Sequence, residues 1–425
     1  MATAQLIDSG LISGVRTRGE PAHASRWPSC LIVYTPVLFA SVFAKFSPLG
    51  SIFPSIGMLF PAVLLAVAFG LLSGRLRLVP ARLALYLLML SVLMLIQVWR
   101  GEVFSYGSLA MMALIGLAYV PAVHDDSVTQ EDAISFFCNL SVLIALAGIF
   151  QFGLQFVAGT AIAFPIEHYV PDALRTHGYN DLNPLGYGSH IYKATGFVML
   201  EPSVFCQLCA IGLVAELVSK SRTWRLIAYA IAIAVSYSGT GLLVLAITLP
   251  MLVVIHRRWD LLLRGMLLLV VLALLAEPLN LTMTLKRVGE FGSSGSSAFA
   301  RFVGWVELFS DKMWPSTMRA LFGYGSGSFF DAAAGYKAGE MAHAKIMFEF
   351  GVVGSLLYFA FVFYCLLSSR APVALRVAMV VAYFMNGAYS PTVTGFATSL
   401  LLWPSPKTRS EPPEPQRESR EVARA

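Results

Sequence analysis

Charged residues are scarce in this sequence. Asp, Glu, Lys and Arg make up 13% of its 425 residues, whereas hydrophobic residues make up 57%. The mean hydropathy is +0.70, and a surface dissolved in water needs more charge than this composition supplies, so a soluble globular protein is excluded. The apolar runs are continuous rather than alternating, which favours helices over the strands of a membrane barrel. We predict an all-α, polytopic integral membrane protein.

Cysteine is equally sparse. The five cysteines lie in or beside apolar runs, so we predict buried thiols and no disulfide framework. Cys206 and Cys209 form a CxxC pair, but no second ligand pair accompanies it, which favours a packed helix face over a zinc site. There is no Asp/His metal cluster and no basic patch interleaved with aromatic residues, so we expect neither a metal, nor a cofactor, nor a nucleic-acid partner.

Apolar runs predict twelve spans. They cover residues 31–46, 54–72, 83–98, 106–123, 134–157, 202–218, 226–237, 240–255, 261–275, 344–367, 373–388 and 393–403. Residues 1–30 contain three arginines and no apolar core, so they read as a cytoplasmic tail rather than a signal peptide. The turns assigned to the inside carry most of the cations, which places both termini in the cytoplasm. Residues 404–425, rich in Pro, Glu and Arg, should be a disordered cytoplasmic tail.

Two loops on the outer side are far longer than helix connections need to be. They run over about residues 158–201 and 277–343, and both contain titratable groups, glycines and prolines. Long loops on a rigid scaffold are where function concentrates. The stretch 124–132 departs from the excess of cations in the turns assigned to the inside, because it is acidic and carries no cation.

The second loop contains an ordered set of short motifs. An Arg301-x-x-x-Trp305 segment comes first, then a Gly-x-Gly-x-Gly turn at 323–327, then His343 before a helix that carries Glu-x-Gly-x-x-Gly at 349–354. The first loop adds Lys193-x-x-Gly-Phe, ending in Glu-Pro-Ser at 201–203. It also contains Arg175, which is followed by a glycine at 186.

This order of motifs resembles the O-antigen polymerase and ligase superfamily, the Wzy-type membrane glycosyltransferases. The resemblance implies a GT-C-like membrane fold and transfer of a glycan from undecaprenyl diphosphate to a sugar hydroxyl. Ala344 stands where ligases of the superfamily carry a polar residue after the histidine, which favours a polymerase over a ligase.

Such a reaction gathers negative charge on a diphosphate leaving group. Arginine suits that charge, because it stays protonated and its forked donors match phosphate oxygens. Our candidates are Arg301 and Arg175 as catalytic residues and Arg287 as a substrate-binding residue, with Lys193 and Lys286 adding to the field. The alternative for each arginine is a contact with solvent or a lipid headgroup.

His343 is the candidate base that takes the proton of the acceptor hydroxyl, because histidine titrates near neutral pH. The alternative is an interfacial histidine with a backbone partner. Glu201 and Glu349 are candidate substrate-binding carboxylates. Glu201 precedes Pro202, so it also suits a helix N-terminus, and Glu349 follows Lys345 by four residues, so a local ion pair explains it as well.

Gly323 and Gly325 could bring backbone amides to a phosphate, although a plain flexible turn is the simpler interpretation. No Lys-Ser/Thr pair follows them, so they do not form a nucleotide-binding loop.

The function predicted from these observations is a polymerase that joins lipid-linked repeat units at the outer face of the bacterial inner membrane, for O-antigen, capsule or exopolysaccharide. A chain-length regulator and a flippase are possible partners, besides the lipid-linked oligosaccharide and membrane lipid. The alternatives are a ligase that delivers glycan to lipid A core, a polysaccharide transporter or flippase, and a non-catalytic assembly subunit. Charge concentrated in the outer loops rather than in the spans favours surface chemistry over transport.

Overall fold

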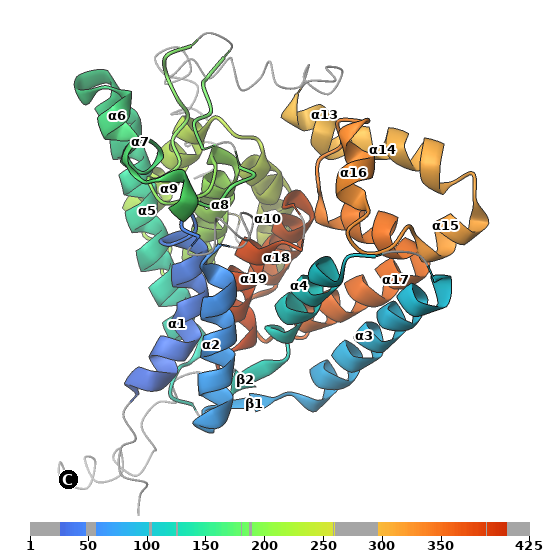
Figure 1. Cartoon of the computed structure of the whole chain (residues 1–425). Coiled ribbons are helices and arrows are strands. Elements are labelled where there is room, and N and C mark those ends of the chain that lie inside the picture. The colour runs from blue at the N-terminus through green and yellow to red at the C-terminus, as the bar shows by residue number, and fades with distance from the viewer. Residues whose placement is uncertain are drawn as a thin grey trace, which may run out of the picture.

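The computed structural model shows a mostly helical protein (Figure 1). It describes residues 26–47, 57–101, 104–124, 126–179, 181–186, 189–257, 259, 296–387 and 389–405. Within these ranges, eleven of the predicted apolar segments are helices. They are α1 Trp27–Ser41, α2 Leu59–Leu72, α3 Pro80–Arg100, α4 Tyr106–Leu117, α5 Gln130–Ala158, α8 Pro202–Val218, α9 Thr223–Ser236, α10 Thr240–His256, α17 Ala342–Leu367, α18 Val373–Met385 and α19 Pro391–Ala397 with its π-helical continuation η4 Thr398–Leu402. The predicted span 261–275 lies outside the described residues.

Three of these helices are long and apolar enough to cross a membrane, namely α3, α5 and α17. The other eight apolar helical segments have 10–17 residues. At 1.5 Å per residue, a helix of 14 residues spans about 21 Å, less than the roughly 30 Å of a hydrocarbon core. The structure therefore has the composition of a membrane bundle, with three full-length candidate spans in the part of the chain that it describes.

Helix α8 lies at the centre of the bundle. It contacts α5, α9, α10 and α18, and nearly all of its side chains are buried. Gly241 of α10 allows α10 to approach α8 closely, because a Cβ atom at this position would lie only 2.5 Å from the carbonyl oxygen of Cys206. Cys206 and Cys209 are both fully buried on α8, as the packed-face interpretation expected.

The end of the bundle opposite the long loops carries a small sheet (Figure 1). Strand β1, Leu76–Leu78, pairs antiparallel with β2, Pro121–Val123. The prediction of one apolar span over 106–123 was therefore wrong at its end, because α4 stops at Leu117. A strand pair between residues 45 positions apart leaves no local pattern, and Pro121 at the first strand position needs no ladder donor.

Both described ends of the chain are held at this sheet. Helix α1 begins at Trp27, four residues earlier than predicted, and the guanidinium of Arg26 forms an ion pair with Asp132. Arg26, directly before α1, thus supplies a cation to the acidic stretch 124–132. Ser405 is buried and forms a bridge to Thr129. Residues 1–25 and 406–425 of the predicted tails lie outside the described residues.

The two long loops fold at the other end. The first contains α6 Thr160–Ala163, α7 Pro165–Tyr169 and the 3-10 turn η1 Asp172–Leu174. The second contains α13 Ser297–Phe302, α14 Gly304–Leu308, the π-helical η3 Phe309–Met313, α15 Thr317–Phe322 and α16 Phe329–Ala334. A separate small core joins the second loop to α17, with Leu308, Phe309, Met313 and Phe329 packed around Phe348.

Helix α17 is interrupted where this loop contacts it. Gly351 has φ 67° and ψ −172°, a conformation in which an L side chain is strained. A Cβ atom there would lie 2.3 Å from the carbonyl group of Leu321, so only glycine lets the two backbones approach. The break therefore fixes the second loop against the N-terminal half of α17.

Candidate functional site

Arg301 and Glu201 form an ion pair between the two long loops. Arg301 lies on α13, and its Nη2 donates to Oε1 of Glu201 at 3.0 Å and to Oγ of Ser203 at 3.2 Å. The Ser203 hydroxyl also donates to the Glu201 carboxylate. The two charged side chains are 20% and 17% exposed, so solvent reaches both. The cluster holds the second loop on the N-terminus of α8.

Glu201 occupies the N-cap position of α8, with extended backbone, but its side chain makes no capping hydrogen bond. Its carboxylate turns to Ser203 and Arg301 instead. Glu201 therefore stands at the helix N-terminus, as the alternative interpretation of this residue expected. Its carboxylate, however, contacts the second loop rather than the amides of the helix.

His343 lies on the first turn of α17, close to the same loop. Its ring contacts that of Trp305 edge to face at 5.2 Å between centroids, and that of Phe384 at 5.9 Å. The ring is also hydrogen-bonded to the backbone of Phe384, whereas Nδ1 is buried and has no hydrogen-bond partner among the described residues. The backbone partner that the alternative interpretation called for is therefore present.

Two contacts place the segments that carry Arg301 and His343 near each other. The first runs through Trp305, which follows Arg301 by four residues and touches the His343 ring. The second begins one turn below Ser203, where Gln207 accepts a hydrogen bond from the side chain of Asn386. The Asn386 carbonyl in turn accepts from the amide of Ala342 at 3.0 Å. Of the three residues predicted to be catalytic, Arg301 and His343 therefore lie at one end of the bundle, on segments that contact each other.

Arg175 is placed differently. Its Nη2 pairs with Asp172, and its Nη1 lies 3.7 Å from Oδ2 of Asp181. Two carboxylates therefore offset its charge, and Arg175 offers a diphosphate less than the sequence prediction assumed. Burial raises the pKa of the Asp181 carboxyl, although Lys45 and Arg175 oppose that shift.

Lys193 is buried rather than turned to a substrate. Its ammonium donates to Oδ1 of Asn183 at 2.9 Å, and its amide donates to the carbonyl of the same residue. These contacts brace the first loop from within. Arg287 and Lys286 lie outside the described residues.

The glycine turn is a packing element. The amide of Gly323 donates to Arg319 at 2.8 Å and that of Gly325 donates to Glu349 at 2.9 Å, both to backbone carbonyls. Because these two amides already have acceptors, the prediction that they cradle a phosphate does not hold in this structure. A Cβ atom on Gly323 would lie 2.5 Å from the backbone of Glu349, which explains the glycine.

Glu349 is fully buried and paired. Lys345 Nζ lies 2.9 Å from its Oε1, and the Tyr389 hydroxyl donates to its Oε2 at 3.2 Å. Tyr389 is in turn hydrogen-bonded to Ser108 of α4 at 2.9 Å. The local ion pair offered as the alternative for Glu349 is therefore present, and this carboxylate fastens α17 rather than facing a substrate.

Sequence reasoning missed Lys45. It follows α1, is 2% exposed, and its ammonium pairs with Glu167 of α7 and donates to Thr195 at 3.1 Å. Burial lowers the pKa of Lys45, and the charge of Glu167 works against that shift. The only local signal was a single cation directly after an apolar run, and nothing in the sequence connects it to a glutamate 122 residues later.

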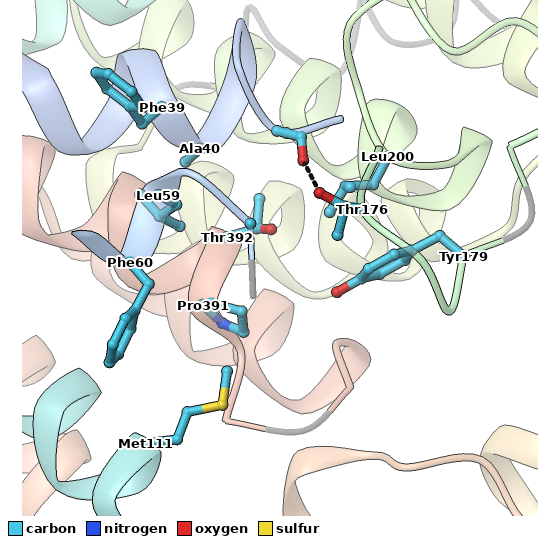
Figure 2. Close-up of a pocket in the computed structure, with 12 residues that line it drawn as sticks. Phe39, Ala40, Leu59, Phe60, Met111, Thr176, Tyr179, Leu200, Pro391 and Thr392 are labelled. Carbon is cyan, nitrogen blue, oxygen red and sulfur yellow. Dashed lines mark hydrogen bonds between the residues drawn. The ribbon is translucent and has the colours of Figure 1, made fainter. Parts of the chain in front are cut away.

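A cavity lies beside these clusters, between α1, α2, α4, α19 and the first loop (Figure 2). It is a narrow space of about 30 Å³ that is partly open to the surface. Its walls are mostly apolar, among them Phe39, Leu59, Phe60 and Met111. Figure 2 shows the Tyr179 hydroxyl directed into this space from the first loop.

Tyr179 also connects the cavity to the charged residues. Burial, together with the charges of Glu201 and Glu340, raises the pKa of Tyr179 to about 12. Glu340 belongs to the second loop, where it lies 3.9 Å from Lys345. The phenol therefore stands where the first loop, the second loop and the cavity meet.

Comparison with known proteins returns no match: no family model fits the chain, and neither a curated protein nor a solved structure is significantly similar to it.

Proposed function

We propose that the chain is a membrane glycosyltransferase that polymerises lipid-linked oligosaccharide repeat units at the outer face of a bacterial inner membrane. The observation that carries the proposal is the grouping of Arg301, Glu201 and His343 at one end of an apolar helical bundle. A guanidinium, a carboxylate and an imidazole with a free acceptor nitrogen are the groups that displacement of a diphosphate by a sugar hydroxyl requires.

Each group has a defined role in this reaction. The acceptor hydroxyl forms a bond to the anomeric carbon of the donor sugar and gives its proton to Nδ1 of His343. The bond from that carbon to the diphosphate oxygen breaks, and its electron pair leaves with the polyprenyl diphosphate. Arg301 stabilises the negative charge that develops there, as fixed guanidinium groups do at leaving phosphates.

Arg301 has donors to spare for this role. A guanidinium carries five N–H groups, and the contacts recorded among the described residues involve Nη2 alone. Arg175 has both terminal nitrogens directed at carboxylates. Of the two candidate arginines that the structure describes, Arg301 is therefore the one proposed to act on the leaving group, and Glu201 orients it.

The test is reconstitution of the full chain in vesicles with a defined undecaprenyl-diphosphate repeat unit. A ladder of products that differ by one repeat supports polymerisation. A single transfer to lipid A core, without a ladder, would assign the chain to the ligases instead. A protein that yields neither product, but equilibrates the lipid-linked unit across the bilayer, would overturn the proposal.

One observation keeps the transport alternative under test. Discontinuous helices with buried ionisable groups are features of transporters, and α17 has a break at Gly351 next to Glu349. The flipping assay on the same vesicles separates the two functions directly.

A further inference from the structure

Helix α3 has an exposed apolar side that reaches to its end beside the second loop. Of the three helices long enough to cross a membrane, α3 is the least enclosed by protein, with 33% of its apolar segment buried against 50% for α5 and for α17. Near its end, Leu95, Val98 and Trp99 are all exposed. Residues three and four positions apart lie on one side of a helix, so these side chains form one apolar strip. In a membrane-spanning helix, lipid covers such a strip.

The strip continues onto the second loop. The ring of Trp99 contacts the ring of Phe322 edge to face, at 5.2 Å between centroids. Phe322 is the last residue of α15, and Trp99 stands one residue before the end of α3. Helix α15 therefore ends level with the end of this candidate span. Figure 1 shows α14 on the side of the second loop that is turned away from α3.

Helix α15 has an exposed apolar face of its own. Met318 and Leu321, three residues apart on this helix, are 52% and 38% exposed, and Trp314 in the turn before it is 48% exposed. We refer to these three residues as the α15 face. The backbone behind them is held rigidly, because Leu321 packs against Gly351 of α17 so closely that no Cβ atom would fit between them. The apolar side chains are thus fixed in an outward position by the fold.

Cationic residues and a tyrosine accompany the α15 face. The guanidinium of Arg319 lies over the ring of Tyr324, 4.5 Å from its centroid. The Tyr324 hydroxyl donates to the backbone carbonyl of Lys312 at 2.6 Å, and Lys312 is itself exposed. Tryptophan and tyrosine together with arginine and lysine are the residues that collect at the boundary between lipid and water. The composition of this segment therefore suits a position at a membrane surface.

We propose that the α15 face inserts into the phospholipid leaflet at the loop end of the bundle, where acyl chains cover it together with the end of α3. The partner is lipid rather than protein because the face continues, through the contact of Trp99 with Phe322, a strip that lipid already covers. The second loop is then held at two places, on α8 by the pair of Arg301 with Glu201 and on the membrane by α15. This attachment does not depend on glycosyl transfer.

Site-directed photo-crosslinking tests the attachment. A benzophenone amino acid replaces Trp314 or Met318 on the α15 face, Leu95 on the lipid-covered strip of α3, or Val306 on α14. Val306 is the matched control, because it is apolar, belongs to the same loop and is 47% exposed. The full chain is irradiated in vesicles of phosphatidylethanolamine and phosphatidylglycerol, and phospholipid adducts are counted by intact-protein mass spectrometry.

We expect adducts at 314 and 318 to be as frequent as those at 95 and several-fold more frequent than those at 306. Adducts at 314 and 318 that are no more frequent than at 306 would overturn the proposal. A crosslink between two copies of the chain at 314 or 318, in place of lipid adducts, would also overturn it and would assign the α15 face to self-association.

A charge placed on the α15 face gives a second readout. Met318→Glu should raise the rate at which protease cuts the second loop in the same vesicles several-fold, because a carboxylate is costly to bury among acyl chains. Val306→Glu adds the same charge on α14 and should leave the rate unchanged. An unchanged rate in Met318→Glu, or an equal rise in both variants, would contradict the insertion of α15 into lipid.

Discussion

Nη2 of Arg301 lies 3.0 Å from Oε1 of Glu201, although one hundred residues separate them in the chain. The contact is the point at which the first long loop, the second long loop and the central helix α8 meet. It combines a partly exposed cation with a carboxylate that orients it, and Trp305, four residues after Arg301, contacts the ring of His343.

Replacing Arg301 with lysine should lower the rate of polymerisation about 10²-fold, because an ammonium lacks the forked donors that match a diphosphate. The measurement is the initial rate of ladder formation by purified variant and wild-type protein. Arg77→Lys, an exposed arginine at the opposite end of the bundle, is the matched control and should leave the rate unchanged. A full rate in Arg301→Lys would show that the guanidinium does not contact the leaving group.

The His343→Gln variant should retain its fold and lose about 10²- to 10⁴-fold in rate, the usual contribution of a general base. Glutamine keeps a polar side chain beside Trp305, so detergent-solution thermal unfolding should change little. His124→Gln, at the other end of the protein, controls for the loss of a histidine as such. Comparable rates in the two variants would exclude His343 as the base.

Lys345→Met should destabilise the protein by about 3–5 kcal/mol, because it leaves the buried Glu349 carboxylate without its cation. The double variant Lys345→Met with Glu349→Leu removes both charges and should recover most of that loss. The free energy of unfolding in mixed detergent measures both. If the double variant is no more stable than the single one, the pair is not the electrostatic unit that its 2.9 Å separation indicates.

Gly351→Ala should destabilise the second loop. Its positive φ alone costs about 1–2 kcal/mol for an L residue, and the new Cβ would displace the backbone of Leu321. Gly153→Ala on α5 is the control, because a Cβ there meets nothing within 4 Å and should stabilise the helix by about 0.5–1 kcal/mol. Protease sensitivity of the segment 315–330 would report the difference, and equal resistance in the two variants would contradict it.

Tyr179 should ionise with a pKa of about 12, because burial and the charges of Glu201 and Glu340 oppose formation of the phenolate. An ordinary tyrosine titrates near pH ~10. The readout is the difference in phenolate absorbance between wild-type protein and the Tyr179→Phe variant, followed above about pH 9. A difference that is complete near pH ~10 would show that Tyr179 ionises in the ordinary range.

The helices could be predicted from the sequence because apolar runs and proline mark them locally. The segment predicted over 202–218 is α8 at both ends, with Pro202 at its first turn. The strand pair of Leu76–Leu78 with Pro121–Val123 could not be predicted in this way, because its stability comes from a partner distant in the chain. The break at Gly351 is likewise set by the backbone of Leu321 and leaves no periodic signal.

At the candidate site, too, local contacts could be predicted from the sequence and contacts between distant residues could not. Lys345 and Glu349 are four residues apart on one helix, so their pairing followed from spacing. The pairing of Arg175 with Asp172 was also local, and it shows that an arginine near a motif can already be neutralised. Contacts between distant segments depend on the folded topology. The sequence offered Arg301 and Glu201 as separate candidates without indicating their pairing, and it offered neither Lys45 nor Glu167.

Ser405 has a consequence for how the protein is made. Its amide and carbonyl bond to Val128 and Gln130, and its hydroxyl donates to Asp126, 279 residues earlier. The start of α5 therefore receives these bonds only after the chain has been synthesised through Ser405. Truncation shortly before Ser405 would leave the beginning of α5 without them and open to quality-control proteases.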